Sequence, residues 1–249
     1  IPLPKLMGWW DTKLTKDEHD LFLRYRPYFS NMEDIVEIID GGTNPTGIYK
    51  WIKNYAAKNG KIEKISEFNQ IYIPNDENLI TIILVDHQSL IRKESGLASK
   101  KEAIDKLSEY LQHARDFYGF SPVLVAQMNR DIANPVNQKM DTFEPTPEQI
   151  KDSGTSFEDS DICMSLFDPV KFKTSAPTKH DANKLIDMQT GAKYYRSLKI
   201  HKNTWGEDDI RKGMAFHGAI GHFTELPKFD QMTQSDYDSI LDGSYFLTK

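Results

Sequence analysis

The segment that most constrains the fold is residues 79–86, which read Leu-Ile-Thr-Ile-Ile-Leu-Val-Asp. An aliphatic run of this length is typical of a strand that is buried on both faces of a parallel sheet. Such a strand brings its last side chain, Asp86, to the carboxyl edge of the sheet. We therefore expect an α/β fold, because parallel sheets covered on both faces belong to that class. Open sheets of this class bind ligands at the carboxyl edge.

A lone carboxylate at the end of a buried strand suits Mg²⁺ bound to a nucleotide. Mg²⁺ takes few protein carboxylates and leaves the rest of its coordination shell to phosphate and water. The alternative is that Asp86 only caps the next turn, and for one strand followed by aspartate that alternative is the better interpretation. The sequence after Asp86 decides between the two.

Composition sets the class of protein. The chain has 249 residues, of which 39% are hydrophobic, which is enough for one large α/β domain or two small ones. The net charge of −6 leaves no overall basic surface, so any contact with nucleic acid has to come from local loops. The apolar runs are shorter than the roughly 20 residues of a membrane helix. We expect a cytoplasmic enzyme domain without a membrane partner.

The first third of the chain predicts a helix, a strand and a second helix. Thr15 is a suitable N-cap for a helix to about Tyr25, and residues 34–39 predict a strand. A glycine-rich turn then leads into a helix with apolar residues at 3.6-residue spacing, namely Ile48, Trp51, Ile52, Tyr55 and Ala56. This order is typical of the βαβ units of a mostly parallel sheet. Residues 60–78 predict an inserted turn or hairpin.

The glycine-rich turn is not a nucleotide-binding loop. Residues 42–47, Gly-Thr-Asn-Pro-Thr-Gly, have the two glycines of a phosphate loop at the right separation. However, Ile48 and Tyr49 stand where a lysine and a serine or threonine are required. We interpret the segment as a tight turn from strand to helix, and the chain contains no other G-x-x-x-x-G-K-[ST] motif.

The middle of the chain predicts a second strand beside the first. A helix over residues 100–118 ends at Gly119, and the strand 122–127 ends on Gln127. Two strands that each end on a polar residue place both side chains beside the same crevice. Further strands are expected at 161–167 and 195–201, followed by two antiparallel strands at 214–217 and 221–223. Polar loops span 128–153 and 170–192.

These pieces resemble, in order and spacing, the RecA-type motor of ring-shaped replicative DNA helicases of the DnaB type and their phage relatives. The resemblance extends from about residue 30 to 225. It is carried by Leu84-Val85-Asp86-His87-Gln88-Ser89, Val125-Ala126-Gln127-Met128-Asn129-Arg130, Ser153-Gly154 with Asp159-Ser160-Asp161, Ile200-His201-Lys202-Asn203 and Ala215-Phe216-His217-Gly218. It implies an α/β fold with a RecA-like, mostly parallel sheet flanked by helices and antiparallel strands at the C-terminal edge.

The resemblance implies roles for individual residues. Asp86 matches the carboxylate that binds Mg²⁺, and Gln127 matches the sensor of the γ-phosphate of ATP. The loop that starts at Met128 matches one that projects into the ring channel and holds single-stranded DNA, with Asn129, Arg130 and Lys139 as contacts. Cations and amides suit binding along the backbone without sequence preference.

Lys202 matches a basic residue that reaches the ATP bound by the neighbouring subunit, where a cation stabilises the transferring phosphoryl group. An ordinary exposed lysine is an equally good interpretation. Two residues on, the family has an arginine finger, and this chain has Thr204. Lys199, Arg211 or Lys212 could substitute for it.

The main departure is the missing phosphate-binding loop, which in this family precedes the region that matches. We therefore divide the chain into a partial RecA-like ATPase core at 1–225, without the P-loop half, and a C-terminal tail at 226–249. The chain begins with Ile1 rather than methionine. We interpret it as part of a longer protein and expect it to be inactive alone; the alternatives are that the P-loop half is a separate polypeptide or that hydrolysis has been lost.

The expected function is that of the C-terminal part of an ATP-dependent replicative helicase motor, which translocates on single-stranded DNA by hydrolysing ATP at subunit interfaces. The implied cofactors are ATP and Mg²⁺. The implied partners are single-stranded DNA, further copies in a ring expected to be a hexamer, and a primase or loader, in a bacterial or phage-infected cell. The alternative is a non-catalytic RecA-fold scaffold or accessory protein in DNA replication or packaging. A recombinase relative or regulator fits the Gln127–Arg130 segment less well.

Overall fold

The computed structural model describes residues 1, 3–8, 13–40, 44–129, 143–150 and 154–247. Its first half contains helices α1 (Leu3–Leu6), α2 (Lys16–Glu33), α3 (Pro45–Asn59) and α4 (Lys100–Tyr118), with strands β1 (Gly60–Lys64), β2 (Gln70–Pro74), β3 (Ile82–Asp86) and β4 (Ser121–Val125). Its second half contains helices α6 (Thr155–Asp159), α7 (Pro169–Phe172) and α8 (Gln234–Asp242), with strands β5 (Ile162–Phe167), β6 (Tyr195–Asn203), β7 (Ile210–His217) and β8 (His222–Glu225).

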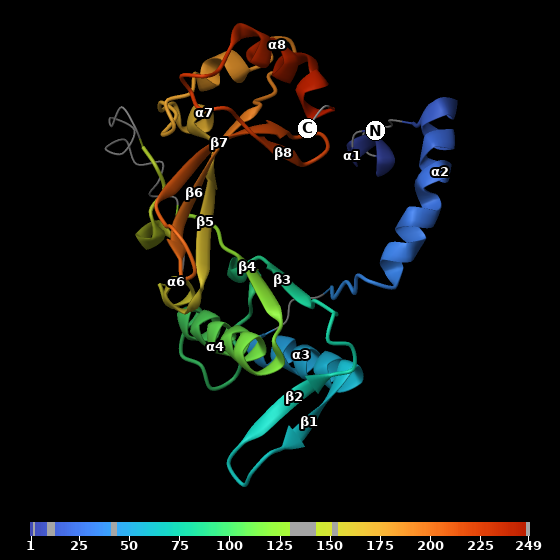
Figure 1. Ribbon diagram of the computed structural model, residues 1–249, viewed down its shortest axis with the longest axis vertical. Coiled ribbons are helices and arrows are strands. Elements are labelled where there is room, and N and C mark those ends of the chain that lie inside the picture. Colours follow the sequence, from blue (N-terminus) through green and yellow to red (C-terminus); the bar gives the residue numbers. More distant parts are fainter. Residues whose placement is uncertain (2, 9–12, 41–43, 130–142, 151–153, 248–249) are drawn as a thin grey trace.

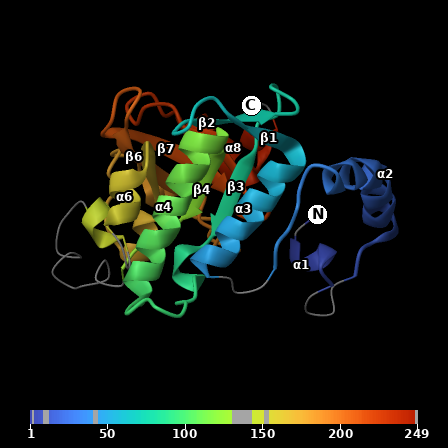
Figure 2. The same ribbon diagram turned by 90° about the horizontal axis from the view of Figure 1, so that it is seen from below.

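The parallel part of the fold is the pair β3 and β4. Ile82 lies opposite Ser121, and Asp86 lies opposite Val125. Figure 2 shows α3 and α4 side by side along this pair. The side chains of Ile83, Val85 and Leu124 pack against a buried cluster drawn mainly from these two helices, which includes Ile52, Ala56, Ala103, Leu107, Leu111, Ala114 and Phe120. The predicted α/β arrangement of a parallel pair covered by helices is confirmed.

The expectation that this strand is buried on both faces was wrong. Along β3, side chains alternate between the helix-covered face and an open face, where Ile82 and Leu84 are 66% and 64% exposed. On β4, Val123 and Val125 are exposed in the same way. The reason is that α3 and α4 both pack on one side of the pair. Among the described residues, β3 and β4 also pair only with each other.

Helix α4 is set by clear local signals. The Ser99 hydroxyl accepts from the Glu102 backbone N–H as an N-cap, and Gly119 ends the helix at φ 71°. Glycine suits this left-handed C-cap because it has no Cβ to clash. The buried positions 103, 107, 111 and 114 recur every three to four residues, so one face of the helix lies in the core. The predicted helix 100–118 is confirmed.

Residues 60–74 form the expected hairpin, in which β1 and β2 pair antiparallel. Tyr72 anchors it to the body, because its ring packs edge to face on Tyr118 and Phe120. Its hydroxyl donates to the Ala56 carbonyl over 3.1 Å. The hairpin is thus held by α3 and α4 rather than by the β3–β4 pair.

The predicted strand 34–39 is not formed. Residues 35–39 are outside regular secondary structure, and Ile35 and Ile38 are among the most exposed apolar side chains of the described chain. Helix α2 begins at its predicted N-cap, Thr15, but continues to Glu33 and buries none of its residues. In Figure 1, α2 stands apart from β3 and β4. An extended segment becomes a strand only when a neighbour accepts its backbone hydrogen bonds.

The second half forms a four-stranded antiparallel sheet in the order β5, β6, β7, β8. The predicted antiparallel strands near the C-terminus are confirmed. Beside this sheet lies a second buried cluster: Ala176, Ala182, Leu185, Tyr195, Ala215, Leu226, Tyr237, Ile240, Tyr245 and Phe246. Half of these residues come from positions 226–246, so the segment expected as a tail packs as part of the core.

We predict that Leu107→Ala lowers the free energy of unfolding by about 2–5 kcal/mol, because Leu107 is fully buried between α4 and its neighbours. Glu109→Ala on the exposed side of the same helix should change it by less than about 0.5 kcal/mol. Urea unfolding followed by circular dichroism measures both. Equal effects of the two substitutions would contradict the assignment of the core face.

Candidate nucleotide-binding edge

Asp86 and Gln127 come together at the carboxyl ends of β3 and β4. Asp86 lies opposite Val125, and Gln127 follows two residues later, just past the end of β4. Both are exposed. The Gln127 Nε2 atom lies 3.1 Å from Nε2 of His87. The structure therefore places the two residues that the sequence singled out at one edge, beside each other and accessible.

The turn after Asp86 is rich in buried polar groups. Gln88 is fully buried and accepts from the Ser156 hydroxyl over 3.3 Å. Within the described chain, the His87 Nδ1 and Ser89 Oγ atoms are buried without a hydrogen-bond partner. Buried polar atoms of this kind are uncommon and often mark places where a ligand, ion or water binds. His87 was not predicted from the sequence, although its position directly after Asp86 was a usable signal.

The donor set at this edge fits one kind of metal. No group of three or more His, Cys, Asp or Glu residues that could hold a metal lies within the described residues. A site that chelates a metal by protein groups alone is therefore not found there. A single accessible carboxylate such as Asp86 fits Mg²⁺ that is carried mainly by phosphate and water.

The acidic residues after residue 154 have a structural role. Arg115 of α4 donates from Nη1 to the Asp159 carbonyl over 3.0 Å and to Asp161 Oδ2 over 2.9 Å. The Ser108 hydroxyl donates to Asp159 Oδ2 over 2.6 Å. These contacts fix α6 and the start of β5 on α4. The sequence showed the two carboxylates but not their partners, because Arg115 lies more than 40 positions away along the chain.

Lys202 is engaged within its own chain. Its ammonium group donates to the carbonyls of Glu158 and Phe157 over 2.6 and 3.3 Å, at the C-terminal end of α6, and lies over the Phe157 ring. A cation at a helix C-terminus is electrostatically favourable. Thr204 donates its backbone N–H to the Asp161 carbonyl over 2.9 Å. Lys202 and Thr204 thus contact α6 and the residue before β5, the segment that Arg115 and Ser108 hold on α4.

The three basic residues considered in place of an arginine finger all form ion pairs. Lys199 contacts Glu144 and Asp209 at 3.0 and 3.1 Å, and Arg211 contacts the same two residues at 2.8 and 3.1 Å. Lys212 contacts Glu225 at 2.6 Å. These partners hold the cations on the antiparallel sheet.

The predicted DNA-binding loop begins directly after Gln127. Its base is closed by an antiparallel bridge between Met128 and Ile150, and the Asn129 N–H donates to the Gln149 carbonyl over 2.7 Å. Asn129 is exposed. The other two predicted contacts, Arg130 and Lys139, lie outside the described residues.

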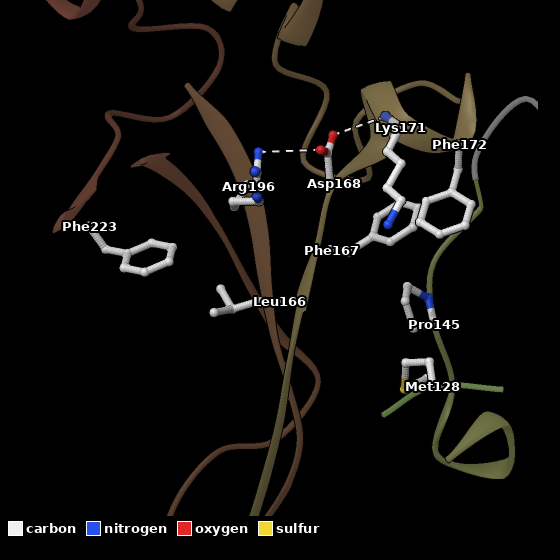
Figure 3. Close-up of a pocket in the computed structure, with 9 residues that line it drawn as sticks. All are labelled: Met128, Pro145, Leu166, Phe167, Asp168, Lys171, Phe172, Arg196 and Phe223. Carbon is white, nitrogen blue, oxygen red and sulfur yellow. Dashed lines mark hydrogen bonds and ion pairs between the residues drawn. The ribbon is translucent and has the colours of Figure 1, made fainter. Parts of the chain in front are cut away.

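Beside the base of this loop lies a cavity of about 210 Å³. Figure 3 shows Phe223, Arg196 and Leu166 on one side of it, and Met128, Pro145, Phe167, Lys171 and Phe172 on the other, with Asp168 between Arg196 and Lys171. Arg196 is held by Asp168 at 3.5 Å and lies over the Phe216 ring. Aromatic rings beside cations are the groups that bind bases and phosphates of nucleic acids.

None of the described helices is long and apolar enough to span a bilayer. No protein-family model and no curated protein matches the chain.

Among solved structures, the chain is similar to a DnaB-like replicative helicase, described together with its interactions with primase. The TM-score is 0.62 at 16% identity, over 91% of this chain and 46% of the other. It is equally similar to the ATPase domain of a second protein, with a TM-score of 0.62 and 16% identity over 91% of this chain and 66% of the other. The chain thus spans about half to two thirds of the proteins it resembles. It has the RecA-like α/β fold of DnaB-like helicase ATPase domains.

Proposed function

We propose that the chain is part of an ATP-dependent DNA helicase motor that binds ATP and Mg²⁺ between subunits of a cytoplasmic ring, a hexamer, and moves along single-stranded DNA. The observation that carries the proposal is the placement of Asp86 and Gln127 at adjacent, accessible ends of a parallel pair. In this proposal Asp86 holds Mg²⁺ and Gln127 reads the γ-phosphate. A RecA-like fold uses this edge for nucleotides.

The chain's own residues would act by binding and orienting. Bound Mg²⁺ neutralises phosphate charge, and the Asp86 carboxylate holds it at the strand end. The Gln127 amide can donate to or accept from groups at the same edge. Because Met128 is bridged to Ile150, movement of Gln127 would be passed to the base of the loop that carries Asn129. We propose that this loop contacts DNA, and that a primase or loader binds the assembled ring.

A second candidate is a non-catalytic scaffold with the same fold. It is favoured by two observations: Lys202 is bound by carbonyls of its own chain, and Thr204 stands where an arginine finger is expected. In that case Lys202 would fix α6 rather than act on a neighbour's nucleotide. The two candidates differ in what removal of the Lys202 ammonium does.

We predict that Asp86→Ala and Gln127→Ala each lower the kcat of DNA-stimulated ATP hydrolysis by about 10²-fold or more in the ring that contains this chain, because each removes a group that contacts transferring phosphate or its metal. Asp238→Ala and Gln189→Ala, at exposed sites elsewhere, are the matched controls. Turnover measured by phosphate release should be unchanged in the controls. Unchanged turnover in both test variants would refute the assignment.

We predict that Lys202→Ala lowers ATPase turnover if the ammonium acts on the neighbour's nucleotide, in addition to the stability lost with its contacts to the α6 carbonyls. If the protein is the non-catalytic scaffold, in which Lys202 only fixes α6, the midpoint should fall and neither the parent nor the variant should hydrolyse ATP. Lys101→Ala, an exposed lysine of α4, is the control for the loss of one charge. Calorimetry and phosphate release on the same samples distinguish the motor from the scaffold.

We predict that Arg130→Ala with Lys139→Ala weakens single-stranded DNA binding and reduces its salt dependence, since each lost phosphate contact lowers the slope of log K against log salt by about 0.7. Basal ATPase should change little. Arg24→Ala with Lys50→Ala removes the same charge from exposed helix positions and should leave the slope unchanged. Fluorescence anisotropy at several salt concentrations measures both pairs. Equal slopes for the two double variants would show that the loop does not contact DNA phosphates.

A further inference from the structure

The imidazole of His87 connects the two strand ends. His87 follows Asp86 directly in the chain, and its Nε2 lies 3.1 Å from the side-chain nitrogen of Gln127. This side-chain contact joins the turn after β3 to the segment that follows β4. Its neighbour Gln88 is fully buried and accepts from the Ser156 hydroxyl, so the turn that carries the ring is anchored in the interior.

The atoms in this contact define the hydrogen bond. With the Gln127 side-chain nitrogen at 3.1 Å from the ring, the amide N–H donates and His87 Nε2 accepts. Nδ1 is buried and has no partner within the described residues. The ring is therefore not a well-satisfied packing group, because a buried polar nitrogen without a partner opposes stability.

The contact restricts a side chain that would otherwise move. Gln127 is exposed, and a free glutamine loses considerable rotamer entropy when a ligand fixes it. Holding one N–H on His87 leaves the amide oxygen and the second N–H available at the edge that carries Asp86. A side chain fixed in advance in this way loses less entropy when phosphate binds.

We propose that His87 is a positioning residue that holds the Gln127 amide at the nucleotide edge and joins it to the strand end bearing Asp86. The proposed reading of γ-phosphate by Gln127 is the function on which this role rests. His87 itself needs no contact with the nucleotide. The role also explains why an imidazole with an unpartnered buried nitrogen is present in this turn.

The test uses the wild-type chain, labelled with ¹⁵N, without nucleotide. We expect a scalar coupling across the hydrogen bond between the Gln127 amide nitrogen and His87 Nε2, with the amide signal assigned by its loss in Gln127→Glu. Absence of the coupling would overturn the proposal. This measurement does not depend on ATP hydrolysis, so it can succeed even if the helicase proposal fails.

Variants then separate positioning from packing. In His87→Phe we expect the Gln127 amide protons to move to the positions of a free glutamine, while the thermal unfolding midpoint stays the same. His87→Gln, which keeps an acceptor, should restore the shifted signals, and His19→Phe at an exposed site of α2 is the control. Gln127 amide signals in His87→Phe that equal those of the wild type would refute the role. The role would also be refuted if His87→Phe lowered the thermal unfolding midpoint and His87→Gln failed to restore the Gln127 amide signals.

Discussion

The parallel pairing of β3 with β4 is the constraint on which the candidate site depends. Because the register sets Asp86 opposite Val125, Gln127 lies beyond the end of β3, where its side chain contacts His87. A shift of one residue would turn these side chains to the opposite face. The register is in turn held by α3 and α4, because Ile83, Val85 and Leu124 fit among their buried side chains. The core beneath the pair therefore sets the geometry of the edge.

The polar residues that the sequence singled out fall into two kinds. Those on the antiparallel sheet and beside α6 are bound by partners in the same chain, as the contacts of Arg115, Arg211 and Lys202 show. They fix elements to one another. At the edge formed by β3 and β4, by contrast, Asp86 and Gln127 are accessible. The structure thus separates residues that hold the fold from residues that can meet a ligand.

Much of this could be read from the sequence because the signals are local. Helix α4 has its cap, its apolar stripe and its terminal glycine in one stretch, β3 ends on Asp86, and Gln127 follows the end of β4 by two residues. What the sequence did not reveal depends on contacts distant in the chain. A strand was expected at 34–39 from its aliphatic residues, but strand formation needs a neighbour that local sequence cannot supply.

The same limit applies to burial and to the site. An aliphatic run cannot indicate whether one or both of its faces will be covered, so the open face of β3 was unforeseen. The link between His87 and Gln127 spans 40 positions, and the link between Arg115 and Asp161 spans 46. The resemblance supplied the fold and the proposed roles of Asp86 and Gln127. The partners that hold them became visible only in three dimensions.

The open face of β3 and β4 also affects how the chain behaves in solution. Ile82 and Leu84 lie exposed beside Val123 and Val125, and both outer backbone edges of the pair lack a strand partner within the described residues. Apolar surface next to unpaired backbone groups is a template on which another polypeptide can add a strand. At high concentration such a surface favours self-association and precipitation. Charged substitutions at Ile82 and Val123 would counter this tendency without entering the core that supports the candidate nucleotide-binding edge.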